Sequence, residues 1–246
     1  EGKATRAEVE DRKAIEAAWR TPAAQEPETG AHPAPGDTSS HVTKADWEAL
    51  AAKLPIEATA AGRDARKALF SRFDPNGNGY LSLAEVDKGL KDVLGEDTAL
   101  FDAKPAIMRA FQAAKGAADT KSKLGADFVE RSEFRLLLVY LKRYFELFVM
   151  FERVDTGDDR RVNEDEFAQA VGMLESWGGG ATAAAAEGKT IDKSGGGEVL
   201  FDEFCDWALT KHLSTFSDGA ADGATADDDL LATAKTSKAK ERAAKK

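Results

Sequence analysis

Oxygen-bearing side chains recur at every second position in one short segment of the chain. The stretch DPNGNGYLSLAE begins at Asp74, places Asn76 and Asn78 at alternate positions and ends at Glu85. A tightly wound loop turns such alternating side chains toward one centre, and Gly79 permits the sharp turn that this winding requires. The spacing matches the calcium-loop pattern in full. Because Ca²⁺ takes about six to eight oxygen ligands, we predict a calcium site in this segment.

The remaining positions of this loop have roles in the same chemistry. Tyr80 would offer its backbone carbonyl, Ser82 would act directly or through water, and Glu85 would close the shell with both oxygens. The candidate ligands are Asp74, Asn76, Asn78, Tyr80, Ser82 and Glu85. Leu81 is expected to anchor the loop by pairing with its counterpart in an adjacent loop. The alternative is an Asn/Gly turn that binds no metal.

A second copy of the pattern, near the C-terminus, is less complete. Its candidate ligands are Asp192, Ser194, Glu198 through its carbonyl, and Glu203. Gly197 supplies the turn, but Gly196 and Leu200 stand where the pattern has ligand side chains. Water would replace the missing ligands, so we expect a Ca²⁺ site of lower affinity than the first.

Two further copies depart more strongly from the pattern. Residues 155–166 have Gly157 at the third position and Arg160 where the turn glycine belongs, and Arg161 adds positive charge. An arginine disfavours the left-handed turn, so we predict a structural hand that has lost its metal. Residues 115–133 are too long for a calcium loop, and we expect no metal there.

These loops belong to an internal repeat that must position them. A glutamate follows an apolar residue by four positions in four places, at Glu85, Glu133, Glu166 and Glu203. The spacing between the last three suits a helix–loop–helix unit with its linker. A single hand leaves its apolar helix faces exposed, so hands pair around a shared core. We therefore predict an all-α protein with two EF-hand pairs, each combining a calcium-binding loop with a degenerate one.

The segments around the repeat have their own signals. Thr43 is expected to cap a helix whose apolar face holds Trp47, Leu50 and Leu54. Residues 132–154 contain no Gly or Pro and are expected to form one long central helix that joins the two pairs. The predicted division is an N-terminal helix and Pro-rich linker (1–42), the N-terminal EF-hand pair (43–140), the C-terminal pair (141–213), and an acidic-then-basic disordered tail (214–246).

Composition narrows the class of function. The 44 acidic residues outnumber the 34 basic ones, which gives a net charge of −10 and argues against a general nucleic-acid binder. The single cysteine, Cys205, excludes an intramolecular disulfide and fits a reducing compartment. No apolar run is long enough for a transmembrane helix. The three histidines lack metal-ligand spacing and no phosphate-binding glycine loop occurs, so we expect no enzyme.

Blocks of sequence outside the calcium pattern are similar to those of one known family. They are DWE from Asp46, LFSRFD from Leu69, EFRLLL from Glu133, FELFVMF from Phe145, ESWG from Glu175 and FDEFCDWA from Phe201. Through them the chain resembles the calflagins, the flagellar calcium-binding proteins of trypanosome-like flagellates. The resemblance implies a four-hand, mostly helical protein of the flagellum in which the first and last hands carry calcium. That family starts with an acylated Met-Gly-Cys; this sequence starts with Glu1-Gly2-Lys3, so acylation is not carried over.

Two functional hypotheses follow. The first is an intracellular calcium sensor or buffer of the flagellum or cilium that binds a protein target or the flagellar membrane. The second is a constitutive structural protein of the axoneme, in which degenerate hands form a helical scaffold on axonemal microtubules. Calcium-dependent binding distinguishes the two, because a scaffold would hold its partner without the ion.

Overall fold

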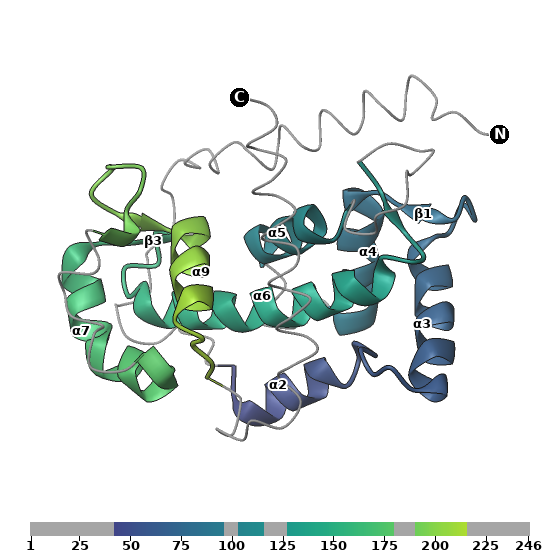
Figure 1. Cartoon of the computed structure of the whole chain (residues 1–246), viewed down its shortest axis with the longest axis horizontal. Helices are drawn as coiled ribbons and strands as arrows, with labels where there is room; N and C mark the ends of the chain where they lie inside the picture. Colours follow the sequence, from purple (N-terminus) through teal and green to yellow (C-terminus); the bar gives the residue numbers. More distant parts are fainter. Residues whose placement is uncertain (1–41, 96–102, 116–126, 180–189, 216–246) are drawn as a thin grey trace, which may run out of the picture.

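The computed structural model describes residues 42–95, 103–115, 127–179 and 190–215. The expected N-terminal helix, the Pro-rich linker and nearly all of the tail lie outside these residues. The described part is mostly helical, as predicted. Its helices are α2 (Lys44–Ala51), α3 (Ala60–Phe73), α4 (Leu83–Leu94), α5 (Lys104–Ala114), α6 (Phe134–Val154), α7 (Glu164–Leu174), the π-helical turn η1 (Glu175–Gly179) and α9 (Phe201–Thr210). Figure 1 shows α6 running across the middle of the molecule.

Local capping chemistry sets where several helices begin. The Thr43 hydroxyl accepts a hydrogen bond from the Asp46 N–H at 3.2 Å, and the Asp46 carboxylate accepts one from the Thr43 N–H at 3.0 Å. This reciprocal pair confirms Thr43 as the cap of α2. Ser82 and Asn163 cap α4 and α7 in the same way, each with a glutamate three residues later.

Four short strands join the loops in pairs. Strand β1 (Tyr80–Leu81) lies antiparallel to β2 (Val129–Glu130), with Leu81 opposite Val129. Strand β3 (Arg161–Val162) lies antiparallel to β4 (Val199–Leu200), with Val162 opposite Val199. All four of these apolar residues are buried. The expected partner of Leu81 is thus confirmed as Val129.

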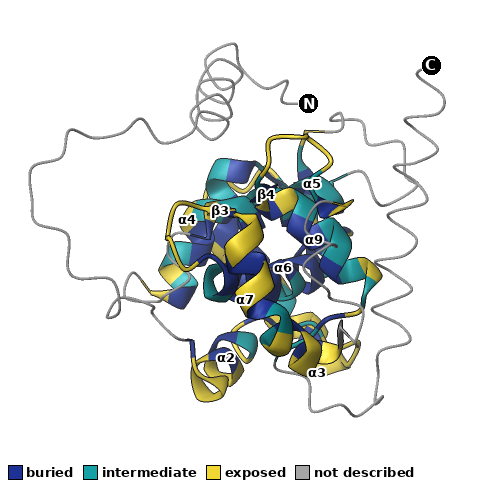
Figure 2. Ribbon diagram, turned by 90° about the vertical axis from the view of Figure 1, so that its left-hand side faces the viewer, coloured by how far each residue is buried: buried dark blue, intermediate teal, exposed yellow. Residues whose placement is uncertain are grey.

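The long central helix is confirmed and forms the core of the whole described body. Helix α6 contacts α3 and α5 on one side of the molecule and α7 and α9 on the other. Its buried residues lie all around its axis, so no face of the helix is left to solvent. Figure 2 shows the buried residues gathered around α6 and the exposed ones on the outer faces of α2 and α7. None of the described helices is both long enough and apolar enough to cross a membrane.

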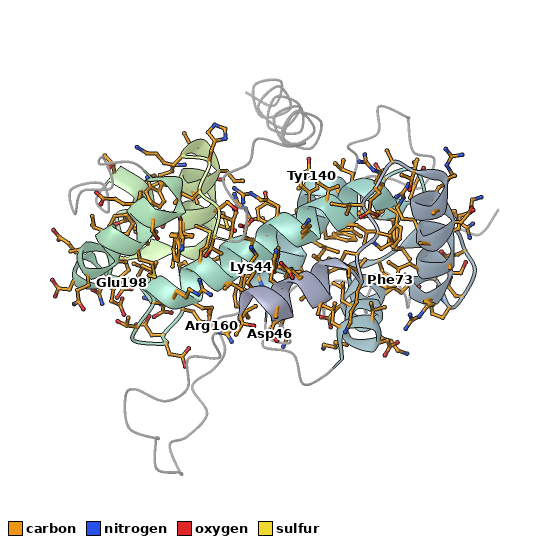
Figure 3. All side chains as sticks on the ribbon, turned by 90° about the horizontal axis from the view of Figure 1, so that it is seen from below. Lys44, Asp46, Phe73, Tyr140, Arg160 and Glu198 are labelled. Atoms are coloured by element: carbon orange, nitrogen blue, oxygen red, sulfur yellow. The ribbon has the colours of Figure 1, made fainter. Side chains whose placement is uncertain are left out.

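Aromatic rings fasten each end of α6. At its start, the Phe134 ring packs edge-on against Phe70 and Phe73 of α3, with centroids 5.1 and 5.6 Å apart. At its far end, the Phe151 ring packs edge-on against Phe201 and Phe204 of α9, at 5.6 and 5.5 Å. Edge-to-face pairs add about 0.5–1.5 kcal/mol each beyond the area they bury. Figure 3, in which Phe73 is labelled, shows side chains filling the space between the helices.

Replacing each of two helical glycines by alanine is expected to change the stability in opposite directions. A Cβ on Gly89 of α4 would lie 2.5 Å from the buried Phe73 ring, whereas a Cβ on Gly172 of α7 would meet nothing within 4 Å. We expect Gly89→Ala to lower the free energy of unfolding by about 1–3 kcal/mol through overpacking. Gly172→Ala should raise it by about 0.5–1 kcal/mol through the helix preference of alanine.

Urea unfolding followed by far-UV circular dichroism, with a calcium chelator present, measures both changes. Equal shifts in the two variants would show that α3 and α4 are not packed together at Gly89.

Candidate metal centres

The first loop is wound around the carboxylate of Asp74. Its Oδ1 accepts a hydrogen bond from the Asn78 N–H at 3.0 Å, and its Oδ2 accepts one from the Gly79 N–H at 2.9 Å. The side chain is only 1% exposed. Gly77 and Gly79 have φ angles of 69° and 86°, in the left-handed region that glycine enters without strain. Asp74 therefore lies at the centre of a turn that glycine makes possible.

The other predicted ligands of this loop face one another across it. The Asn76 Nδ2 donates to the Glu85 Oε1 at 2.8 Å, and the Asn78 Oδ1 accepts from the Tyr80 N–H at 3.0 Å. The Ser82 hydroxyl donates to the Glu85 Oε2 at 2.8 Å. The structure thus brings Asn76, Ser82 and Glu85 into direct contact, while Tyr80 packs its ring against Phe128 in the neighbouring loop.

The last loop repeats this winding. The Asp192 Oδ2 accepts from the Gly197 N–H at 2.7 Å, and its Oδ1 accepts from the Ser194 hydroxyl at 2.8 Å. These hydrogen bonds, with the one from Gly197 the largest contribution, lower the pKa of Asp192. The Glu203 Oε1 accepts from the Ser194 N–H at 2.8 Å. The Glu198 carboxylate turns away to Arg161, so only its backbone carbonyl is left in the predicted role.

The third loop keeps the shape despite its substitutions. The Asp155 Oδ2 accepts from the Arg160 N–H at 2.7 Å, and the Glu166 Oε1 accepts from the Gly157 N–H at 2.7 Å. Asp158 and Arg160 have φ angles of 54° and 66°, the same left-handed turn that glycines make in the other two loops. Left-handed backbone costs a non-glycine residue about 1–2 kcal/mol, so packing must hold this loop in place. Arginine therefore does not prevent the turn, although its charge remains beside the loop.

All four repeats share one hydrogen bond at their final glutamate. Its Oε2 accepts the N–H of the residue three positions earlier, at 2.9–3.0 Å, in Glu85 with Ser82, Glu133 with Glu130, Glu166 with Asn163 and Glu203 with Leu200. In the first, third and last loops this glutamate therefore also holds the N-cap residue of the following helix. Most of the second loop lies outside the described residues, so its lack of metal stays a prediction.

The donor set indicates what kind of ion these loops suit. Within the described ranges, no group of three or more His, Cys, Asp or Glu side chains gathers as a metal site. The first loop instead combines carboxylate, amide, hydroxyl and carbonyl oxygens. All-oxygen sets with few charges suit a hard cation such as Ca²⁺ and not zinc or copper. Cys205 takes no part, because it is buried and burial raises the pKa of its thiol.

The contacts of three arginines near the loops were not predicted from the sequence. Arg131 lies over the Phe70 ring, 4.8 Å from its centroid, with a guanidinium nitrogen 3.9 Å from Asp74 Oδ2. Arg161 reaches Glu198 of the neighbouring loop at 2.6 Å. Arg109 of α5 pairs with carboxylates on α9. Figure 3 shows Glu198 labelled at the opposite end of the molecule from Phe73. No local spacing signals such contacts, because each partner comes from another element.

The buried carboxylate of the third loop predicts a pH-dependent stability. Burial raises the pKa of Asp155 to about 6, against smaller opposing contributions from the Arg160 and Asp159 N–H groups. Between about pH 3.8 and pH 6 the unfolded chain has released this proton while the folded chain still holds it. This group's contribution to stability therefore falls as pH rises through that window and is constant above it.

We expect Asp155→Asn to gain about 1–3 kcal/mol of stability relative to the native chain between pH 4 and pH 7. Chemical unfolding at several pH values, with a chelator present, gives this difference. A difference that does not change with pH would show that Asp155 ionises at its ordinary pKa.

Comparison with known proteins identifies a family. The FCaBP EF-hand domain matches residues 50–141. A flagellar calcium-binding protein of Trypanosoma cruzi is 39% identical over 173 residues, which cover 70% of this chain and 82% of that protein. Flagellar calcium-binding protein TB-24 of Trypanosoma brucei brucei is 36% identical over 176 residues, covering 71% and 81%. TB-44A of the same organism is 37% identical over 182 residues, covering 74% of this chain and 45% of its own length. The chain belongs to the flagellar calcium-binding protein family.

Proposed function

We propose that this chain binds Ca²⁺ through loops 74–85 and 192–203 and acts in the flagellum as a calcium sensor or buffer. The observation that carries the proposal is the first loop, in which Asn76 reaches Glu85 across a turn centred on the buried Asp74. The proposed ligands are Asp74, Asn76, Asn78, Tyr80, Ser82 and Glu85, with Asp192, Ser194, Glu198 and Glu203 in the weaker site. Relatives named for the flagellum and for calcium support both the ion and the location.

The arrangement that we propose is four helix–loop–helix units in two pairs. The antiparallel strands β1 with β2, and β3 with β4, support the pairing of the first loop with the second and of the third with the fourth. Each pair then contains one calcium-binding and one degenerate loop. The proposed boundary between the pairs lies within α6, near residue 140. The protein is a binding protein and not an enzyme.

Glu85 connects ion binding to a change of shape. Its two oxygens hold Asn76 and the N-terminal turn of α4. Coordination through both oxygens would exchange these hydrogen bonds for the ion and so act directly on the start of α4. Gly89 of that helix packs closely on the Phe73 ring of α3. A movement of α4 would open this contact and expose apolar surface, which favours a sensor that binds a protein or membrane target.

Removing one glutamate at a time tests the assignment of the sites. We expect isothermal titration with Ca²⁺ to show two sites in the native chain, and Glu85→Gln to abolish the tighter one. Glu203→Gln should abolish the weaker one. A bidentate carboxylate is lost in each case, while the glutamine retains the size of the side chain.

Glu166→Gln is the matched control, because this residue holds the third loop in the same way but has no proposed ligand role. Loss of a site in the Glu166→Gln variant would contradict the assignment. Absence of any binding in the native chain would favour the constitutive axonemal scaffold.

A sensor, unlike a buffer, must change shape when it binds the ion. We expect hydrogen–deuterium exchange in α3 and α4 to become faster on calcium addition, because the Phe73–Gly89 contact opens. The Glu85→Gln variant should show no such change. Calcium binding with unchanged exchange would identify a buffer. Co-sedimentation with microtubules in the presence of a chelator would identify a scaffold.

A further inference from the structure

A salt-bridge cluster joins α5 to α9 beside α6. The Arg109 guanidinium on α5 lies 2.7 Å from the Asp202 carboxylate of α9 and forms a second, very close pair with Asp206 of the same helix. Its Cζ lies over the Tyr144 ring of α6, 5.4 Å from the centroid. The Arg109 side chain is 19% exposed. Figure 1 shows α5 and α9 on the same side of α6.

The two aspartates lie close to Glu203, the final residue of loop 192–203. Asp202 and Asp206 lie one helical turn apart in the first half and middle of α9, and Glu203 stands between them in the sequence. Within the loop, the Lys193 ammonium lies 3.4 Å from Asp206, and the Lys193 N–H donates to Glu203 at 2.9 Å. The first turn of α9 is thus held from α5 by Arg109 and from the loop by Lys193.

We propose that Arg109 is a positioning residue for the calcium site of loop 192–203, supplied by the opposite half of the molecule. This inference rests on the proposed function of that loop. Glu203 is the first-turn residue that must present both oxygens to the ion. Because the planar guanidinium bridges two carboxylates one turn apart, it fixes the direction of this turn, and Glu203 with it.

Electrostatics alone predicts that the loss of Arg109 strengthens calcium binding, whereas loss of positioning weakens it. Removing the Arg109 charge makes the surroundings of the loop more negative, and this would tighten calcium binding. The Asp202 and Asp206 side chains are 75% and 48% exposed, however, so water screens their charge and the gain is small. Loss of groups that orient metal ligands weakens metal binding by about 10- to 100-fold. The loss of positioning therefore exceeds the gain in charge, and calcium binding becomes weaker.

The test isolates each site in the full-length chain. In a Glu85→Gln background, where only the last loop is proposed to bind, we expect Arg109→Gln to raise the calcium Kd about tenfold. Arg109→Lys should also weaken binding, because an ammonium group cannot bridge both carboxylates. Arg161→Gln is the charge control, since it removes a salt bridge to the same loop without touching α9. It should leave the Kd unchanged or lower it.

The first site serves as the control for general damage. In a Glu203→Gln background, Arg109→Gln should leave the calcium Kd of loop 74–85 within about twofold of its value with Arg109 in place. Circular dichroism checks folding, and Asp202→Asn replaces Arg109→Gln if that variant does not fold, because it breaks the bridge from the other side and leaves the Lys193–Asp206 pair in place.

An unchanged or lower Kd for the last loop in Arg109→Gln would overturn the inference. A calcium Kd in Arg109→Lys equal to that with native Arg109 would also overturn it, and so would equal weakening of both calcium sites by Arg109→Gln. No binding by the last loop in the Glu85→Gln chain with native Arg109 would overturn both this inference and the proposed function of that loop.

Discussion

One carboxylate per repeat holds the loop to the helix that follows it. Glu85, Glu166 and Glu203 each accept an N–H at the start of their helix through one oxygen, and the other oxygen accepts a donor from near the beginning of the loop. A single side chain thus closes the loop and caps the helix. If Glu85 and Glu203 are ligands, as we propose, ion binding acts directly on the start of the helix that follows each loop.

The shared central helix imposes a second constraint. Both ends of α6 are fastened by aromatic clusters, one from α3 and one from α9, and its buried residues surround its axis. Neither half of the described body can bury its apolar residues without this helix. The segment after α9 also contacts α6, since the buried Glu146 of α6 accepts hydrogen bonds from the Ser214 hydroxyl and the Thr215 N–H. Ser214 and Thr215, the first two residues of the predicted disordered tail, therefore make ordered contacts with α6.

The loop shape in this protein does not depend on glycine at the turn positions. The third loop reproduces the left-handed turns of the first and last loops with Asp158 and Arg160 in place of glycine. Its first aspartate, Asp155, accepts hydrogen bonds from the N–H groups at the fifth and sixth loop positions, as the first aspartates of the other two loops do. Pairing of β3 with β4 holds this backbone against its local preference. The loops differ in the donor set that each presents and in the arginine charge nearby, and on these differences rests our prediction that the third loop binds no ion.

The sequence by itself determined the elements whose causes are local. The cap at Thr43, the turn at Gly79, the glycine-free central helix and the alternation of oxygen donors before Glu85 all depend on neighbours within a few residues, so residue types and spacing suffice to predict them. The same information could not show that Arg131 lies beside Asp74 or that Arg109 bridges two carboxylates on α9. Tertiary structure decided these contacts, because each joins residues far apart in the chain that meet only when the helices pack around α6.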